Sequence, residues 1–360
     1  MSAPTVYKKR VAKLKGELEQ LGLDAFVTLN LKNIRYLTGF TGTSAAIVIA
    51  GGKPLFVTDF RYATQIKKEV TSMQTSIAKS MKKSIADHLS EKKANNIGYE
   101  GNTLTVDALN SIKKLHSGKW KSVQPIETLR TIKDDTEIKL IEKNFKILSK
   151  VFKLIPEMIK PGRIERDIAA EMEYRLRETG GDGKAFEFIV ASGKRSALPH
   201  GVAGTKKIKR GDFVTVDWGC VLDGYHTDNT RNFSVGKPKG KLLKIHEIVL
   251  EANLRATEKV ADGVPLIEID FAARDFINKK GFGHRFGHGT GHGVGLDIHE
   301  APNVSQNAEN TVAKEGMIFT IEPGIYVPGL GGVRIEDMVL VTKAGSRLLS
   351  RSIPKELVII

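Results

Sequence analysis

The chain has 360 residues, of which 41% are hydrophobic, and a formal net charge of +15 at pH 7. This length predicts two domains, and the composition is that of a globular protein that can bury two cores. No apolar run reaches the roughly 20 residues that a membrane-spanning helix needs, and the start of the chain lacks the apolar centre of a secretion signal, so we expect no membrane partner. A single cysteine, Cys220, cannot form an internal disulfide, which fits a cytoplasmic location.

The positive charge is concentrated in the first part of the chain. Residues 1–130 contain 21 lysines and arginines against 10 acidic residues, whereas the remainder contains 35 against 31. A basic region can bind nucleic acid, but these lysines are scattered over helix positions and no aromatic or glycine-rich binding motif accompanies them. We therefore interpret them as a solvated surface and expect no nucleic-acid partner.

The first third of the chain alternates helix-like and strand-like segments. The expected helices are 6–21, 84–93 and 105–115, and the expected strands are 24–29, 45–50, 54–58 and 97–99. This alternation predicts an α/β N-terminal domain in which helices cover a sheet. A boundary is expected within 125–133, so the predicted domains are 1–128 and 129–360.

The rest of the chain combines long helices with strand pairs. Helices are expected from 134 to about 160 and at 164–179, 242–260 and 266–280, the first of them capped by Asp134 or Asp135. Strands are expected at 213–218, 226–235, 317–322 and 332–342. Helices interleaved with strand pairs predict an α+β catalytic domain.

Two aspartates stand in the strand-like segments of this domain. Asp217 ends the apolar run VTVD, and Asp228 follows in YHTDNTR after the turn sequence LDG. A hairpin would bring both carboxylates together on paired strands. Adjacent buried carboxylates repel each other unless a proton or a cation lies between them, so the pair is a candidate metal site. The alternative is that one aspartate is a surface residue of the hairpin.

A glycine-rich segment, GHGTGHGVGLDIHE at 287–300, contains His288, His292 and His299. Histidine is a common metal ligand and the usual acid–base group at neutral pH. The glycines exclude a helix and allow the backbone to approach a ligand closely. The alternative is a flexible loop with incidental histidines.

Glu322 in TIEPG and Glu336 in VRIED each place a glutamate among apolar strand residues. Four carboxylates and one histidine suit two divalent ions better than one. Without cysteine ligands they favour Mn²⁺, Co²⁺, Fe²⁺ or Zn²⁺ over copper. Two ions about 3.5–4 Å apart lower the pKa of a shared water, which predicts hydrolytic chemistry.

In combination, these segments resemble the creatinase/aminopeptidase family with the pita-bread catalytic fold, which includes methionine aminopeptidase, prolidase and aminopeptidase P. The matching segments are VDWGCVLDGYHTDNTRNF, GHGTGHGVGLDIHE, TIEPG and GGVRIED, supported by LRTIKDDTEIKLI and SGKRSALPHG. They cover about 130–360. In the first third, NIRYLTGFTGTSA and FVTDFRY resemble the creatinase-like N-terminal domain of Xaa-Pro peptidases, which methionine aminopeptidases usually lack.

The resemblance implies two divalent ions per subunit, with Mn²⁺ as the expected metal. Asp217 and Asp228 would bind one ion, and His292 and Glu322 would bind the other. Asp228 and Glu336 would each bridge the two ions. Glu322 would also have a catalytic role, because it would carry a proton for the attacking water.

The resemblance also implies roles around the substrate. The other expected catalytic residues, which would surround the peptide, are His200 in LPHG, His288 and His299. Tyr326 and Arg334 would form an outer layer that orients the metal ligand Asp217.

The favoured function is an Xaa-Pro aminopeptidase, which releases the first residue of a peptide with proline second; the family suggests a homodimer. The closest alternative is prolidase, which cuts only Xaa-Pro dipeptides and must hold the free carboxylate of the substrate. An arginine would be expected after the HExP run, but Asn303 follows HEAP here, although Arg195 or a neighbouring subunit could substitute. Less favoured are creatinase, which needs arginines for its carboxylated substrate, and a non-catalytic binding protein with the pita-bread fold.

Overall fold

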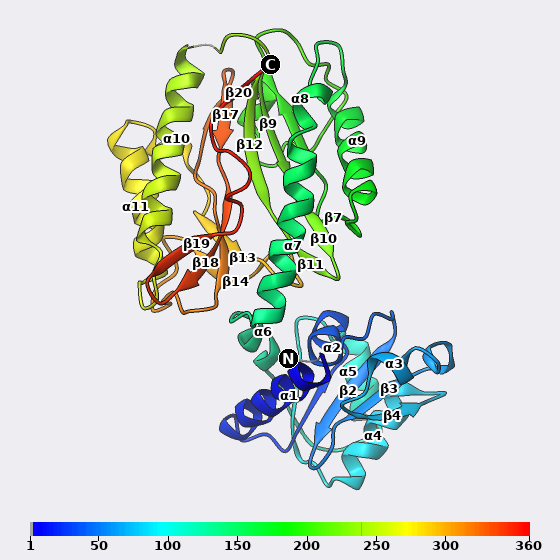
Figure 1. The fold of residues 1–360 in the computed structure, drawn as a ribbon. Coiled ribbons are helices and arrows are strands. Elements are labelled where there is room, and N and C mark those ends of the chain that lie inside the picture. Colours follow the sequence, from blue (N-terminus) through cyan, green and yellow to red (C-terminus); the bar gives the residue numbers. More distant parts are fainter. Residues whose placement is uncertain (1–2, 239) are drawn as a thin grey trace. The chain divides into compact units, whose positions relative to one another are not determined.

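The computed structural model describes residues 3–238 and 240–360, and the chain forms two compact units, 1–130 and 131–360 (Figure 1). The sequence places the boundary between 128 and 129. Each unit has its own apolar core.

The first unit is built on one six-stranded sheet with the order β4-β3-β2-β1-β5-β6. Its strands are β1 (Ala25–Thr28), β2 (Ala45–Ala50), β3 (Leu55–Thr58), β4 (Gln74–Ile77), β5 (Asn96–Tyr99) and β6 (Lys119–Ser122). Its helices are α1 (Ala3–Gln20), α2 (Leu31–Thr38), α3 (Ile66–Glu69), α4 (Met81–Glu91), α5 (Val106–Lys113) and α6 (Pro125–Arg130), with a short 3-10 turn, η1 (Phe60–Tyr62). β1 pairs antiparallel with β2 and parallel with β5, so the sheet is mixed.

The core of this unit lies between the central strands and the helices that cover them. Ala46 and Val48 of β2 pack with Ile85 and Leu89 of α4 and with Ile112 of α5. The predicted α/β class is therefore confirmed. The sequence misses β4 and β6, which are the two edge strands of the sheet and carry mostly polar residues instead of an apolar run.

The second unit holds the remaining elements. Its helices are α7 (Asp135–Phe152), α8 (Ile155–Met158), α9 (Glu165–Glu178), α10 (Gly240–Lys259) and α11 (Leu266–Lys279), with short 3-10 turns η2 (Gly193–Ala197) and η3 (Gly283–Arg285). Its first strands are β7 (Gly183–Lys184), β8 (Ile189–Ser192), β9 (Phe213–Trp218), β10 (Cys220–Leu222), β11 (Tyr225–His226), β12 (Asn229–Ser234) and β13 (Gly291–Gly293). The others are β14 (Glu300–Val304), β15 (Ile318–Ile321), β16 (Gly324–Val327), β17 (Gly331–Arg334), β18 (Asp337–Thr342), β19 (Gly345–Leu348) and β20 (Val358–Ile359).

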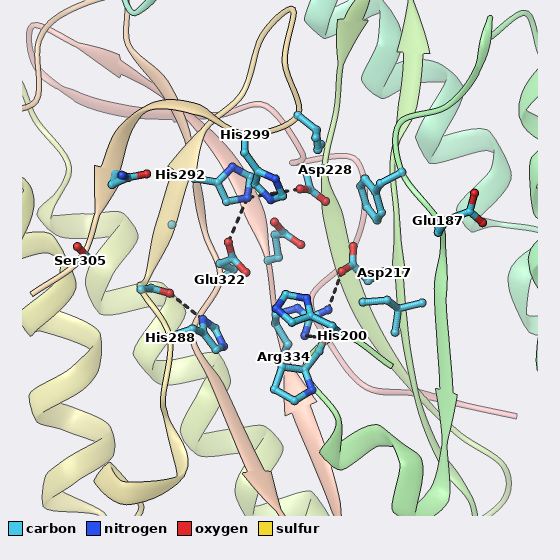
Figure 2. Close-up of a pocket in the computed structure, with 18 of the residues that line it drawn as sticks. Glu187, His200, Asp217, Asp228, His288, His292, His299, Ser305, Glu322 and Arg334 are labelled. Atoms are coloured by element: carbon cyan, nitrogen blue, oxygen red, sulfur yellow. Dashed lines mark hydrogen bonds and ion pairs between the residues drawn. The ribbon is translucent and has the colours of Figure 1, made fainter. Parts of the chain in front are cut away.

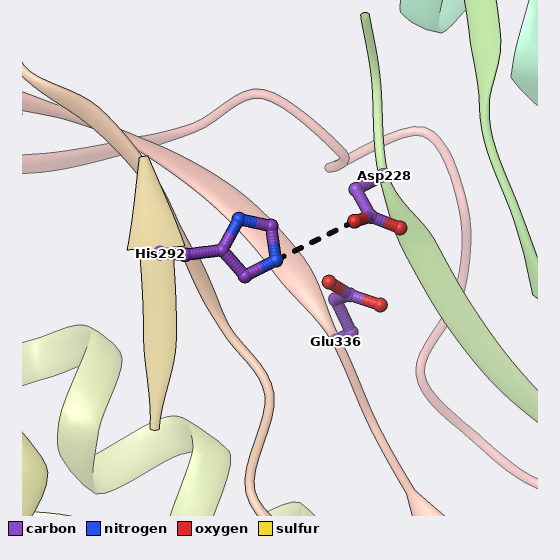
Figure 3. A group of neighbouring side chains, drawn as sticks. All are labelled: Asp228, His292 and Glu336. Atoms are coloured by element: carbon purple, nitrogen blue, oxygen red, sulfur yellow. Dashed lines mark ion pairs between the residues drawn. The ribbon is translucent and has the colours of Figure 1, made fainter. Parts of the chain in front are cut away.

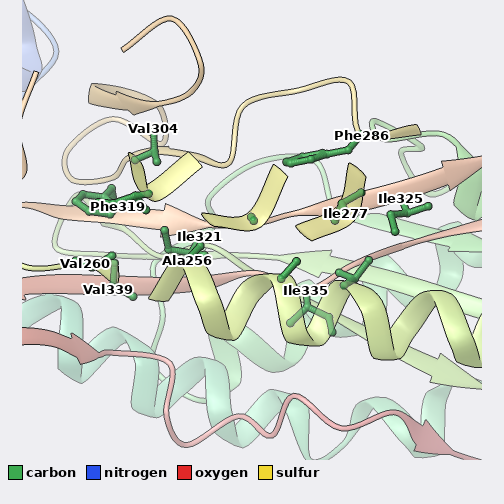
Figure 4. Packing of buried hydrophobic residues seen from close by; sticks show 14 of the residues in the cluster. Ala256, Val260, Ile277, Phe286, Val304, Phe319, Ile321, Ile325, Ile335 and Val339 are labelled. Carbon is green, nitrogen blue, oxygen red and sulfur yellow. The ribbon is translucent and has the colours of Figure 1, made fainter. Parts of the chain in front are cut away.

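The strands of the second unit lie between two pairs of helices, as Figure 1 shows for α7 and α9 on one side and α10 and α11 on the other. The main sheets have the orders β20-β12-β9-β8 and β14-β13-β15-β18-β19. Ala256 of α10 and Ile277 of α11 belong to one apolar cluster with Phe319, Ile321 and Val339 of the strands (Figure 4). Close packing in this cluster keeps the strands rigid, and these strands carry the functional residues.

Candidate metal centre and active site

The two aspartates lie where the chain crosses from β9 to β12. Asp217 is in β9, opposite Thr230 of β12, but Asp228 precedes β12 and lies outside the paired strands. The prediction that both aspartates stand on paired strands is therefore wrong. Between them, β10 and β11 form a separate short hairpin. A side-chain carbon at Gly219 would lie 2.0 Å from the carbonyl oxygen of Thr227, so glycine permits the crossing.

The two glutamates also stand just outside strands. Glu322 follows β15, and Glu336 lies between β17 and β18. The predicted continuous strand over 332–342 is wrong, because the chain changes partner here: β17 pairs with β16, whereas β18 pairs with β15. At the change, the backbone of Glu336 bridges to Thr230 next to the aspartates.

His292 in β13 completes the cluster. Its Nε2 lies 3.3 Å from Oε1 of Glu322 and 3.6 Å from Oδ2 of Asp228. Asp228, His292 and Glu336 each offer one ligand atom within 4.8 Å of the others, and they point toward one another in Figure 3. Figure 2 shows Asp217 facing the same cavity. The structure thus brings together all five residues that the sequence proposes as ligands.

The cluster has more buried negative charge than its protein partners balance. Burial, and then repulsion by neighbouring carboxylates, raises the pKa of Asp228 and of Glu336. Among the described residues, Oδ1 of Asp217 and Oδ1 of Asp228 are buried without a hydrogen-bond partner. Such oxygens are costly unless a cation binds them, and hard divalent cations prefer oxygen ligands. The residues present therefore fit divalent metal ions.

Glu322 differs from the other carboxylates because it contacts His292. Burial by itself would raise the pKa of Glu322, but the hydrogen bond and the charge of His292 lower it to about 2. Burial likewise opposes the charge of His292, yet its contact with Glu322 raises the pKa of His292. The carboxylate is thus held in its ionised form next to the other ligands.

A chain of hydrogen bonds connects His288 with Asp217. Nε2 of His288 lies 3.0 Å from the hydroxyl of Tyr326, and Nη1 of Arg334 donates to the same hydroxyl across 3.0 Å. Nη2 of Arg334 then donates to Oδ2 of Asp217 across 2.6 Å. Arg334 therefore orients Asp217 directly, whereas Tyr326 acts through Arg334.

The remaining two histidines face the same cavity. The rings of His299 and His292 are 4.2 Å apart between their centres, and His200 lines the opposite part of the wall in Figure 2. Burial, followed by the neighbouring His292, lowers the pKa of His299, and burial also lowers the pKa of His288. His299 and His288 therefore favour the neutral form, in which each ring has one N–H donor and one acceptor nitrogen. In His288 these two nitrogens face the carbonyl of Gly289 and the hydroxyl of Tyr326.

The cavity in front of this cluster has a volume of about 560 Å³. Its apolar wall is formed by Phe186, Ile189, Pro199, Val202 and Ile298. A cavity that combines apolar side chains with a few convergent polar groups is typical of a site that orients a small ligand.

Comparison with known proteins gives the family. Residues 139–343 match the model of metallopeptidase family M24, and residues 10–132 match the creatinase/prolidase N-terminal domain. The chain belongs to metallopeptidase family M24. The predicted family, the two-part fold class with its pita-bread catalytic domain, the peptidase class and the need for divalent ions are therefore confirmed.

Relatives of this M24 peptidase cover almost its whole length. An Xaa-Pro dipeptidase of Pyrococcus furiosus is 40% identical over 351 residues, 96% of this chain and 98% of that protein. The structure of an Xaa-Pro dipeptidase from Bacillus anthracis has a TM-score of 0.96 and 39% identity, with 98% and 100% of the chains covered. An X-Pro aminopeptidase from Thermotoga maritima has a TM-score of 0.89 and 35% identity, with 96% and 100% covered.

Two threonines that the sequence analysis misses contact the carboxylates of the M24 site. Oγ1 of Thr230 donates to Oε2 of Glu336 across 2.6 Å and accepts from Nε of Arg334. Oγ1 of Thr320 donates to Oε1 of Glu322 across 3.1 Å and accepts from the amide of His292. Thr320, in β15, stands two residues before Glu322, and side chains two apart in extended chain share a face. That spacing is the signal that could have found it.

Arg195, which the sequence leaves open as a partner for a substrate carboxylate, is already engaged. It forms a salt bridge with the buried Glu165, and its Nη2 donates to the carbonyl of Val202 across 2.8 Å. Arg195 does not line the cavity.

None of the described helices of this M24 peptidase is long and apolar enough to cross a membrane.

Proposed function

We propose that this M24 peptidase is an Xaa-Pro dipeptidase, a prolidase. The observation that carries the proposal is its full-length similarity to two proteins named Xaa-Pro dipeptidases, at 39% and 40% identity. The site supports it, because one cavity is lined both by apolar side chains and by the cluster of carboxylates and histidines.

This proposal reverses the order that the sequence favours. The aminopeptidase is favoured there because no arginine follows HEAP, but a missing cation at one position leaves other donors open. The described cavity contains Asn303 and the neutral ring of His299, and both can donate hydrogen bonds to a carboxylate. The aminopeptidase is the second candidate, supported by the similarity to the Thermotoga maritima enzyme.

We propose two divalent ions per subunit, with Mn²⁺ as the metal because the ligand set is rich in oxygen. Asp217 and Asp228 would hold one ion and His292 and Glu322 the other, with Glu336 completing the ligand set. When bound, the ions supply Lewis acidity and lower the pKa of water at neutral pH. The two partnerless oxygens of Asp217 and Asp228 support this assignment.

The other side chains act on the peptide. Glu322 accepts a proton at its carboxylate from the water that attacks the scissile carbonyl. It returns this proton to the leaving nitrogen of proline. His299, neutral at pH 7, donates a hydrogen bond to the oxygen of the scissile carbonyl as negative charge develops there. His288 lines the same cavity, with Nδ1 donating to the carbonyl of Gly289 and Nε2 accepting from the hydroxyl of Tyr326. His200 binds the substrate from the wall that also carries Pro199 and Val202.

The assembly and location are also part of the proposal. We propose a homodimer, which size-exclusion chromatography with light scattering can test, and a reducing compartment such as the cytoplasm. The single cysteine, Cys220, which is free and can form no internal disulfide, supports the second point. We further propose that the units 1–130 and 131–360 act as separate functional domains.

The experiment that tests the function compares Ala-Pro with Ala-Pro-Ala after loading with Mn²⁺. A prolidase should have at least a tenfold higher kcat/KM for Ala-Pro, and Ala-Ala should be cleaved poorly. A clear preference for Ala-Pro-Ala would overturn the dipeptidase assignment and support the aminopeptidase. Equal cleavage of Ala-Ala and Ala-Pro would contradict the requirement for proline.

A further inference from the structure

A buried carboxylate on α11, outside the cavity, binds the loop that carries His288. Asp270 is fully buried. It accepts two hydrogen bonds from Arg274, one turn further along the helix: Nε donates to Oδ2 across 2.6 Å and Nη2 to Oδ1 across 2.8 Å. It also accepts the hydroxyl of Thr290 across 2.7 Å and the amide of Thr290 across 3.2 Å, both at Oδ1.

Arg274 binds the other part of the same loop. Its Nη2 donates to the carbonyl of His288 across 2.8 Å, and its Nη1 donates to the carbonyl of Phe286 across 3.2 Å. The guanidinium carbon lies 4.3 Å from the centre of the Phe286 ring. The pair Asp270–Arg274 therefore contacts every second residue of the segment 286–290.

This segment needs such contacts, because it lies outside the helices and strands and has glycine on both sides of His288. Apart from its chain neighbours, Gly287 has no atom within 4 Å of the place where a side chain would begin, so no side-chain packing holds the loop at this position. Glycine loses the most conformational freedom on folding, so the loop would otherwise populate many conformations.

The contacts reach the active site at two points. Nε2 of His288 lies 3.0 Å from the hydroxyl of Tyr326, and the amide of Glu322 donates to the carbonyl of Thr290 across 2.7 Å. In Figure 2, His288 and Glu322 lie next to each other in the wall of the cavity. A displacement of the loop would therefore move the imidazole relative to the ligand cluster.

We propose that Asp270 and Arg274 are positioning residues for catalysis, because they hold the imidazole of His288 in the cavity wall, against the hydroxyl of Tyr326. The inference rests on the role proposed above for His288. Neither residue touches the cavity, so both act through the loop.

A purely stabilising role explains the pair less well. α11 already packs through Leu266, Ile269, Ala273 and Ile277, which are fully buried in the apolar cluster. A buried ion pair adds little net stability compared with apolar residues of the same volume, although breaking it is costly. What the pair supplies, and apolar residues could not, is a set of directed hydrogen bonds to the loop.

The test uses Asp270→Asn and Arg274→Met in the full-length, metal-loaded enzyme. The matched control is Asp275→Asn, an exposed carboxylate on the same helix. We expect the first two variants to lower kcat for Ala-Pro about 10–100-fold, with KM changed less than threefold and metal content unchanged. Arg274→Lys, which keeps one donor, should recover part of the loss, and the control should behave as wild type.

Two further measurements separate positioning from general damage. Hydrogen–deuterium exchange of the peptide spanning 286–291 should become at least tenfold faster in Arg274→Met and remain unchanged in the control. In a His288→Ala background, Asp270→Asn should lower kcat less than threefold further, because residues that act through one group are not additive. The same fold-loss in both backgrounds, or unchanged exchange, would overturn the inference.

The double-mutant cycle of Asp270→Asn and His288→Ala compares ratios of kcat, so it applies to whichever peptide the wild type cleaves. The preference of the wild type between Ala-Pro and Ala-Pro-Ala tests the proposed function, whereas the cycle tests the positioning pair. A wild-type kcat in His288→Ala would refute the inference at its first step, whatever the substrate preference.

Discussion

Arg334 donates from Nη2 to Oδ2 of Asp217 across 2.6 Å, and the other oxygen of Asp217 is left without a hydrogen-bond partner among the described residues. The guanidinium thus fixes the orientation of a carboxylate whose second oxygen is available to a cation. Groups that hydrogen-bond to a metal ligand in this way commonly set metal affinity and activity.

Arg334→Lys should lower kcat about 10–100-fold and reduce the metal content below two ions per chain. Lysine keeps the charge but lacks the planar fork that binds Asp217, Tyr326 and Thr230 together. Metal analysis and steady-state kinetics check this, with Arg347→Lys at an exposed pair as the control. Two ions and a wild-type kcat in Arg334→Lys would contradict the role.

Asp228→Asn should abolish activity while the fold is retained. An amide in place of the carboxylate removes a negative charge from a site that balances divalent cations. In the metal-free protein the same change should raise the melting temperature, because burial and repulsion raise the pKa of Asp228 and disfavour its ionised form. Asp223→Asn, in the exposed turn of the β10–β11 hairpin, is the control; wild-type turnover in Asp228→Asn would refute the ligand assignment.

His299→Ala should lower kcat about 10²–10³-fold with the metal retained, the usual loss when a donor to a developing oxyanion is removed. The ring lies next to His292 but is assigned to the substrate instead of the metal. Metal analysis decides between the roles. A loss of metal in proportion to activity would show that His299 is a ligand.

Asn303→Arg should raise kcat/KM for Ala-Pro and leave Ala-Pro-Ala unchanged or poorer. Asn303 lines the cavity opposite His292 in the sheet register. A charge-assisted hydrogen bond to the dipeptide carboxylate contributes about 1.5–3 kcal/mol, which corresponds to about 10–100-fold. Asn307→Arg adds the same charge outside the cavity and is the control. Equal gains for both variants would show that the added positive charge attracts the dipeptide without a specific contact to its carboxylate.

The free energy of unfolding should fall as the pH drops from about 6.5 to about 4, partly because of His246. Burial lowers the pKa of this ring to about 4, whereas in the unfolded chain it is about 6.5. Between these values the unfolded state binds more protons, so stability rises with pH. His246→Phe should flatten this dependence in urea titrations at pH 4.5 and 7; an unchanged difference between the two would exclude His246 as a cause.

The sequence alone determined which residues could form the site. Carboxylates inside apolar runs, such as Asp217 and Glu322, and histidines between glycines, such as His288 and His292, carry their signal locally, because their cost or rarity in such surroundings is a property of a few neighbouring residues. The alternation of apolar segments likewise predicted the two fold classes. The sequence could not predict the exact strand limits, because Glu336 lies where the chain changes its pairing partner.

Only the tertiary structure decided how these residues are held and which are free to act. Arg195 is bound to Glu165, 30 positions earlier, and the loop of His288 is bound to Asp270 on a helix that reads only as amphipathic. Thr230 meets Glu336 across more than 100 positions of sequence. Hydrogen bonds depend on distance and direction between groups that only the packing of distant segments brings together, so no local pattern of residues encodes them.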